Sequence, residues 1–121
     1  IPGVGKVLAM TILYEVHDIA RFPTVQDFSS YARLIRCARE SAGKRSGTSG
    51  AKIGNPHLKW AISEAAVLML RHGEVDKLRN RLHRKHGKGK AMGVLTHKLG
   101  RTIYYMLLRK KPFDLERFLA A

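Results

Sequence analysis

Cysteine is nearly absent from this sequence, and acidic residues and long apolar runs are scarce as well. Cys37 is the one cysteine, which excludes a disulfide framework and a zinc site built on several thiolates. No apolar run approaches the roughly 20 residues that cross a bilayer, and no secretory signal pattern opens the chain. These absences favour a chain that works in a reducing, cytoplasmic setting with no membrane partner.

Acidic residues are heavily outnumbered by basic ones. The 121 residues include 23 Lys and Arg against 9 Asp and Glu, which gives a formal net charge of +14. A compact domain with this excess repels itself unless an anionic partner offsets the charge. Nucleic acid is the usual partner of this kind, and an anionic membrane surface is a rarer one. The alternative is a basic domain that has no anionic partner.

Hydrophobic residues make up 45% of the chain, which suits one folded domain of this length. Their spacing is helical nearly throughout, and no segment alternates as a strand does. We therefore predict an all-α fold with helices near residues 4–17, 24–34, 55–72, 75–86, 91–110 and 114–118. The segment 35–55 is rich in Gly, Ser, Lys and Arg, and it predicts a long mobile loop of the kind that often carries function.

Several residues mark where these helices begin and end. Thr24, Asn55 and Asp114 have side chains typical of helix N-caps. Gly73 predicts the end of the helix that Asn55 starts, and residues 87–90 predict a break before the long helix that follows. The expected core positions recur at helical spacing and are Val7, Leu8, Ile12, Val16, Leu58, Ala61, Ile62, Ala65, Met69, His72, Leu95, Leu99, Ile103 and Met106.

The segment Pro2-Gly3-Val4-Gly5-Lys6 precedes an apolar helix, as the hairpin of a helix-hairpin-helix DNA-binding motif does. Two glycines let the backbone turn tightly and present N–H groups, and the helix start adds its positive dipole. A phosphate held by Gly3, Gly5 and Lys6 would be bound without any base being read. The first helix of such a motif would precede Ile1, so we expect a fragment of a longer protein. The alternative is that the glycines form only a tight turn between helices.

A second set of residues is more specific. It runs in the order Arg21-Phe22-Pro23, Tyr31-Ala32, Ser41-Ala42-Gly43-Lys44 and Lys52-Ile53-Gly54-Asn55, and ends at Leu58. Together with the Pro-Gly-Val-Gly start, it resembles the carboxy-terminal domain of the insertion-sequence one-ten family of transposases, to which the Piv-type DNA invertases are related. The chain departs from that family's pattern at Ala42 and Arg33, where the family prefers Gly, and at Arg36, where Pro is common.

The resemblance implies a two-domain enzyme that cuts and rejoins DNA. The amino-terminal half would be a RuvC-like domain whose acidic tetrad binds Mg²⁺, and this chain would hold no cofactor of its own. Ser41 would be the catalytic residue that attacks the DNA backbone and becomes joined to it. DNA and a guide RNA would be the partners of a homo-oligomeric protein at the prokaryotic nucleoid. Without the RuvC-like half, the isolated chain is expected to be inactive.

The residues around Ser41 suit phosphoryl transfer. A serine hydroxyl is a weak nucleophile unless it is activated, and positive groups stabilise the charge that develops around the phosphate. The cations available for this purpose are Arg33, Arg36, Arg39, Lys44, Arg45 and Lys52. Composition alone leaves Ser46 and Ser49 equally available, and a solvated linker is the alternative.

A dense set of cations on the helix expected at 75–86 predicts contact with the nucleic-acid backbone. These cations are Lys77, Arg79, Arg81, Arg84 and Lys85, and Lys88 and Lys90 follow them. A solvated charged face is the alternative. Arg109, Lys110 and Lys111, near the end of the chain, are equally explained by compensation of a helix dipole.

Histidines and aromatic residues give weaker signals. His83 and His86 lie three residues apart with no third ligand at a suitable spacing, so no metal site is predicted. Trp60, Tyr104 and Tyr105 are candidates for stacking on bases, although rings on apolar helix faces are more often core. The sequence thus predicts a DNA-binding, nucleophile-bearing transposase domain, and the alternative is a non-catalytic helix-hairpin-helix module.

Overall fold

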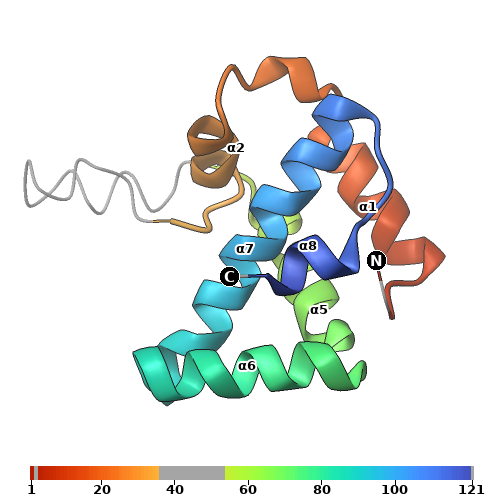
Figure 1. Ribbon diagram of the computed structural model, residues 1–121. Helices are drawn as coiled ribbons and strands as arrows, with labels where there is room; N and C mark the ends of the chain where they lie inside the picture. Colours follow the sequence, from red (N-terminus) through yellow and green to blue (C-terminus); the bar gives the residue numbers. More distant parts are fainter. Residues whose placement is uncertain (2, 36–53, 121) are drawn as a thin grey trace, which may run out of the picture.

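The computed structural model describes residues 1, 3–35 and 54–120 of the chain (Figure 1). Within these residues the fold consists of six α-helices, one 3-10 turn and no strand, which confirms the all-α prediction. The elements are α1 (Lys6–Val16), the 3-10 turn η1 (Ile19–Arg21), α2 (Val25–Tyr31), α5 (Pro56–Met69), α6 (Gly73–His86), α7 (Lys88–Arg109) and α8 (Leu115–Leu119).

The long helix α7 is the central element of the fold. It runs through the middle of the molecule, and α2, α5, α6 and α8 all pack against it, while α1 packs against α5 (Figure 1). Leu95, Leu99 and Ile103 of α7 are buried, as the sequence predicted, because a spacing of about four residues keeps them on one helix face. Met106, expected in the same stripe, is only half-buried.

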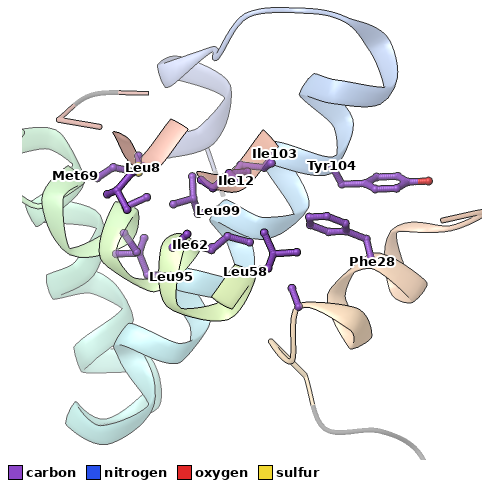
Figure 2. Close-up of a cluster of buried hydrophobic side chains, with 14 of the residues drawn as sticks. Leu8, Ile12, Phe28, Leu58, Ile62, Met69, Leu95, Leu99, Ile103 and Tyr104 are labelled. Carbon is purple, nitrogen blue, oxygen red and sulfur yellow. The ribbon is translucent and has the colours of Figure 1, made fainter. Parts of the chain in front are cut away.

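Every neighbour of α7 buries its apolar face in one shared core (Figure 2). Phe28 of α2 lies against Tyr104 of α7, with ring centroids 5.6 Å apart. The buried Tyr104 hydroxyl donates a hydrogen bond to the carbonyl of Phe22 over 2.8 Å, so the one polar atom of that ring is satisfied. The other labelled core residues from α1 and α5 are Leu8, Ile12, Leu58, Ile62 and Met69.

Val7, expected in the core, and Trp60, a candidate for either the core or stacking on bases, both lie on the surface. Val7 is 78% exposed and Trp60 is 54% exposed. Each precedes a buried residue by one position, and a step of one residue turns about 100° around a helix and leaves the buried face. The expectation that Val7 belongs to the core is therefore wrong, and Trp60, for which both a core and a base-stacking position were open, lies outside the core.

The helix starts that the sequence predicted are confirmed by their hydrogen bonds. The Asp27 N–H donates to the Thr24 hydroxyl over 3.1 Å, and Asp27 accepts from the Thr24 N–H over 3.2 Å, which together form a capping box at α2. Asn55 accepts from the N–H groups of the second and third residues of α5 over 2.9 and 3.0 Å. Asp114 caps α8 through the Arg117 N–H over 3.2 Å.

Two predicted helix boundaries are wrong. Gly73 begins α6, whereas α5 already ends at Met69 and His72 is the N-cap of α6, accepting at Nδ1 from the Glu74 N–H over 3.3 Å. Here a ring nitrogen supplies the cap that the sequence pattern did not reveal. The break predicted at residues 87–90 is limited to Gly87, because α7 already begins at Lys88.

Candidate nucleic-acid interface

The turn before α1 packs closely on the end of α5. Gly3 has a φ of +79°, and a Cβ placed on it would lie 2.7 Å from the Leu68 carbonyl oxygen. The Val4 N–H donates to the Ile1 carbonyl over 3.2 Å and closes the turn. Only glycine meets both requirements without strain. Gly3 therefore has a structural role in the contact between the turn and α5, which is what the tight-turn alternative describes.

Gly5 and Lys6 are placed differently from Gly3. Gly5 is the N-cap of α1 in an extended conformation, and no side chain among the described residues caps this helix end. A Cβ on Gly5 would meet no described atom within 4 Å beyond its chain neighbours, and Gly5 and Lys6 are both exposed. The first N–H groups of α1 thus face the surface beside a cation. A helix-hairpin-helix motif remains a prediction.

The two ends of the segment that contains Ser41 are fastened to each other. The Asn55 N–H, just after this segment, donates to the Tyr31 carbonyl, just before it, over 2.7 Å. The Asn55 side-chain amide donates to the Tyr31 hydroxyl over 3.0 Å and to the Glu15 carboxylate over 2.7 Å. A hydrogen bond to a carboxylate is about twice as strong as a neutral one. Asn55 therefore joins α1, α2 and α5 where the segment leaves and re-enters the fold.

Arg21 completes this network. Its guanidinium lies over the Tyr31 ring at 5.0 Å and over the Phe22 ring at 5.1 Å, and it donates to the Val16 carbonyl over 2.8 Å. The hydrogen bond from Arg21 and, next, that from Asn55 lower the pKa of the Tyr31 hydroxyl. The motifs Arg-Phe-Pro, Tyr-Ala and Gly-Asn, which are separate in the sequence, meet here at one place.

Gly54 fits closely into the same place. It has a φ of +115°, and a Cβ on it would lie 2.7 Å from both the Tyr31 carbonyl oxygen and Cγ of Arg33. Arg33 itself has a φ of 59°, in the left-handed region. The chain thus turns sharply on both sides of the segment, and the glycine of the Gly-Asn motif is required by the close approach.

The central residues of the predicted catalytic loop lie outside the described residues. They are Ser41, the alternatives Ser46 and Ser49, and the cations Arg36, Arg39, Lys44, Arg45 and Lys52. Their roles remain predictions. What the structure describes is the anchored pair of chain ends on either side of them, at residues 31–35 and 54–55.

The predicted cations of α6 fall into two groups. Lys77 is paired with Glu74 over 3.2 Å, and Arg79 is paired with Asp76 over 2.9 Å, both within the first half of the helix. These pairs offset part of the positive charge locally. Acidic residues in the first turn also stabilise the helix through its dipole. The start of α6 therefore offers less free positive charge to a phosphate than the sequence suggested.

The cations in the second half of α6 are not offset by nearby acids among the described residues. Arg84 and Lys85 are exposed and contact no carboxylate in the part of the chain that the structure describes. Exposed Lys88 and Lys90 follow at the start of α7. Arg81 donates to the Leu119 carbonyl over 3.3 Å, which turns it toward α8. The free cations of this region thus gather at the corner between α6 and α7.

The structure also gathers cations that the sequence interpretation did not assign to a site. Lys98, Arg101 and Arg117 line a groove between α7 and α8, together with Arg109 and Lys111. A signal was present in the sequence, because no Asp or Glu occurs between residues 77 and 113. Helical spacing on α7 then places several cations of this run along one face.

Two other kinds of site are not seen in the described residues. Residues 1, 3–35 and 54–120 contain no group of three or more His, Cys, Asp or Glu side chains placed to hold a metal ion. Over the same residues, none of the helices combines the length and the apolar character needed to cross a membrane. His83 and His86 therefore have no third metal ligand among the described residues.

These features define a helical, strongly basic domain that holds together the ends of a serine-containing segment. The chain belongs to the IS116/IS110/IS902 transposase family, whose model matches residues 1–83. The family resemblance inferred from the motifs is thereby confirmed.

One relative is the transposase for insertion sequence element IS1111A of Coxiella burnetii (strain RSA 493 / Nine Mile phase I). This chain is similar to it with 27% identity over 118 residues, which covers 93% of this chain and 32% of that protein. The chain thus spans about a third of the length of the curated relative it matches. No solved structure matches the chain.

Proposed function

We propose that this chain is the DNA-binding, nucleophile-bearing domain of a transposase, and that Ser41 is its nucleophile. The observation that carries the proposal is the network of Arg21, Tyr31 and Asn55, which fastens together the two ends of the segment containing Ser41. All these residues fall within the range matched by the family model. An anchored segment suits a nucleophile that must reach its substrate in a reproducible position.

The proposed step exchanges one phosphoester bond for another. The Ser41 Oγ forms a bond to a DNA phosphorus, and the bond from that phosphorus to a deoxyribose oxygen breaks. The proton of the serine hydroxyl passes to a general base. The leaving deoxyribose oxygen takes up a proton and becomes a free hydroxyl. A hydroxyl of a second strand then loses its proton and attacks the same phosphorus, the bond from phosphorus to the Ser41 Oγ breaks, and the serine takes up a proton as the DNA is rejoined. Arg39, Lys44, Arg45 and Lys52 are proposed to stabilise the charge on the phosphate.

Two surfaces of the described residues are proposed to hold the DNA backbone. One is the start of α1, where Gly5 and Lys6 are exposed beside an uncapped helix end. The other is the second half of α6, where Arg84 and Lys85 are exposed. Both offer positive charge or N–H groups to phosphates without base-reading side chains, so binding by this chain should depend little on sequence.

The rest of the machinery is proposed to lie in a longer protein. A RuvC-like domain would hold Mg²⁺ in its acidic tetrad, and a guide RNA and further copies of the protein would complete the assembly. We place no metal ligand among the described residues, because they contain no suitable cluster. The matched relative, of which this chain covers 32%, is long enough to include such a domain.

Serine substitutions in the full-length transposase test this proposal. Ser41→Ala should abolish recombination while leaving DNA binding nearly unchanged, because it removes the attacking oxygen and none of the positive charge. Ser46→Ala and Ser49→Ala are the matched controls, since each removes one hydroxyl from the same segment. Recombination that survives Ser41→Ala contradicts the assignment, and loss with either control moves the nucleophile to that residue.

A further inference from the structure

A groove of about 760 Å³ lies between α7 and α8, apart from the two surfaces proposed above. In Figure 1, α8 crosses α7, and the two helices are in contact. The cations that line the groove are Lys98, Arg101, Arg109, Lys111 and Arg117. Its volume is within the range of about 300–1,000 Å³ that is typical of ligand sites.

The cations of this groove have little countercharge. Among the described residues that line it, Asp114 is the one acid, and its side chain already caps α8. Burial, and then the neighbouring charges of Arg101 and Arg81, lower the pKa of Lys98. Like charges held this close repel one another, and an anion in the groove would relieve that repulsion.

The groove also offers a flat surface for stacking. The Arg109 guanidinium lies 4.5 Å from the centre of the Tyr105 ring, and Tyr104 supports Tyr105 from its edge at 5.2 Å. Both Arg109 and Tyr105 line the groove, and Arg109 is exposed. Arginine planes and aromatic rings are the surfaces on which proteins stack unpaired bases.

The charged edge of the groove is long enough for several nucleotides. Lys98 and Arg109 are separated by about three turns of α7, or roughly 16 Å at 1.5 Å per residue. A nucleic-acid strand places one phosphate about every 3.4 Å along a helical axis. An unwound single strand spaces its phosphates more widely than this axial rise, so the edge matches a few phosphates, more than a single nucleotide or free phosphate would occupy.

We propose that this groove is a second polynucleotide site, which binds a single strand of DNA or RNA. Its cations contact the phosphates, and the Arg109–Tyr105 pair stacks on a base. A single strand fits because its bases are free to enter a groove, whereas duplex bases are already stacked and paired. The inference rests on the proposed function only in that both assign nucleic acid as the partner.

The test compares labelled single-stranded and duplex oligonucleotides of the same sequence by fluorescence anisotropy, with the intact 121-residue chain. The groove variant Arg101→Gln/Arg109→Gln should bind the single strand about tenfold more weakly and the duplex nearly as well as the original chain. Lys59→Gln/Arg71→Gln is the matched control, because it removes the same charge from exposed positions that do not line the groove. Circular dichroism checks that each variant keeps its helices.

A second pair of variants tests stacking without a change of charge. Tyr105→Leu should weaken single-strand binding at least about fivefold, the lower range for one stacked base, whereas Tyr105→Phe should retain it. Both variants are measured with single-stranded DNA and with single-stranded RNA. Weaker binding of either nucleic acid by Tyr105→Leu, with binding retained by Tyr105→Phe, supports the site, and unchanged binding by Tyr105→Leu contradicts it.

The results separate this inference from the proposed function. If the groove variant binds single strands like its matched control, the second site is wrong, although duplex binding by the original chain still supports the proposed function. If the original chain binds neither single strands nor duplex, both are wrong. The inference is also overturned if the groove variant weakens the binding of the single strand and of the duplex equally, because the groove would then be part of a general duplex-binding surface.

Discussion

The side-chain amide of Asn55 donates a hydrogen bond to the Glu15 carboxylate over 2.7 Å, across 40 residues of chain. The oxygen of the same amide caps α5 by accepting from the N–H groups of His57 and Leu58. One side chain thus starts α5 and ties it to α1 and, through Tyr31, to α2. Asn55 therefore fixes how the two chain ends on either side of the segment that contains Ser41 are placed relative to each other.

Asn55→Asp separates the two roles of this side chain. Aspartate is as good an N-cap as asparagine, so capping alone predicts no loss of stability. We expect a loss of about 1–3 kcal/mol in the free energy of unfolding, because Asp has no N–H donor for Glu15 and Tyr31 and adds a like charge beside Glu15. Urea denaturation followed by circular dichroism measures it. An unchanged free energy of unfolding would mean that the contacts of Asn55 with Glu15 and Tyr31 do not stabilise the fold.

Alanine at the two glycines before α1 should have different effects. Gly3→Ala should destabilise the fold by at least about 1–2 kcal/mol, because it places a Cβ at positive φ and against the Leu68 carbonyl. Gly5→Ala should cost less than about 1 kcal/mol, since no described neighbour obstructs it. Thermal or urea unfolding of the two variants gives the comparison, and equal losses would contradict the packing of Gly3 on α5.

Two matched double variants test which part of α6 binds DNA. For about six neutralised phosphates, the logarithm of duplex affinity should fall against that of salt with a slope of about −5. Arg84→Gln/Lys85→Gln should flatten this slope by about 2 units. Lys77→Gln/Arg79→Gln removes equal charge but should flatten it less, because these cations are paired with Glu74 and Asp76. If the second variant has the larger effect, the assignment within α6 is reversed.

The half-buried His97 should make stability depend on pH. Burial, and then the charge of Arg101, lower the pKa of His97 in the fold below its ordinary value. The unfolded chain binds the proton first, near about pH 6.5, so this part of the stability is present above that pH and is lost as pH falls toward the lower folded pKa.

The variant His97→Gln provides the measurement. Between about pH 7.5 and about pH 5.5, the original chain should lose more unfolding free energy than the variant, as urea denaturation at the two pH values would show. Equal losses would mean that the His97 environment does not disfavour its charged form.

Local rules were enough to predict much of the fold. Thr24, Asn55 and Asp114 cap helices as expected, because capping depends on a side chain and the next three N–H groups. The same rules failed at Gly73, where the His72 ring caps α6 instead of a glycine ending α5. Helical spacing also placed Leu95 and Leu99 correctly.

The network around Asn55 and the groove between α7 and α8 could not be predicted from local sequence rules, because both depend on how separate helices pack. The hydrogen bond between Asn55 and Glu15 joins residues 40 positions apart in the sequence. The groove between α7 and α8 depends on how the second of these consecutive helices packs on the first. The motifs singled out Arg21, Tyr31 and Asn55 on either side of the segment that contains Ser41, but the packing of α1, α2 and α5 brings these three together. The pairing of Lys77 and Arg79 shows likewise that charge counted along a helix overstates the charge that a ligand meets.

The covalent link between protein and DNA tests the central claim most directly. The full-length transposase is incubated with its DNA, its guide RNA and Mg²⁺, the products are separated on a denaturing gel, and the joined peptide is identified by mass spectrometry. We expect an adduct on Ser41, no adduct with Ser41→Ala, and unchanged adduct with Ser46→Ala and Ser49→Ala. An adduct that persists in Ser41→Ala, or that maps to another residue, contradicts the assignment of Ser41 as the nucleophile.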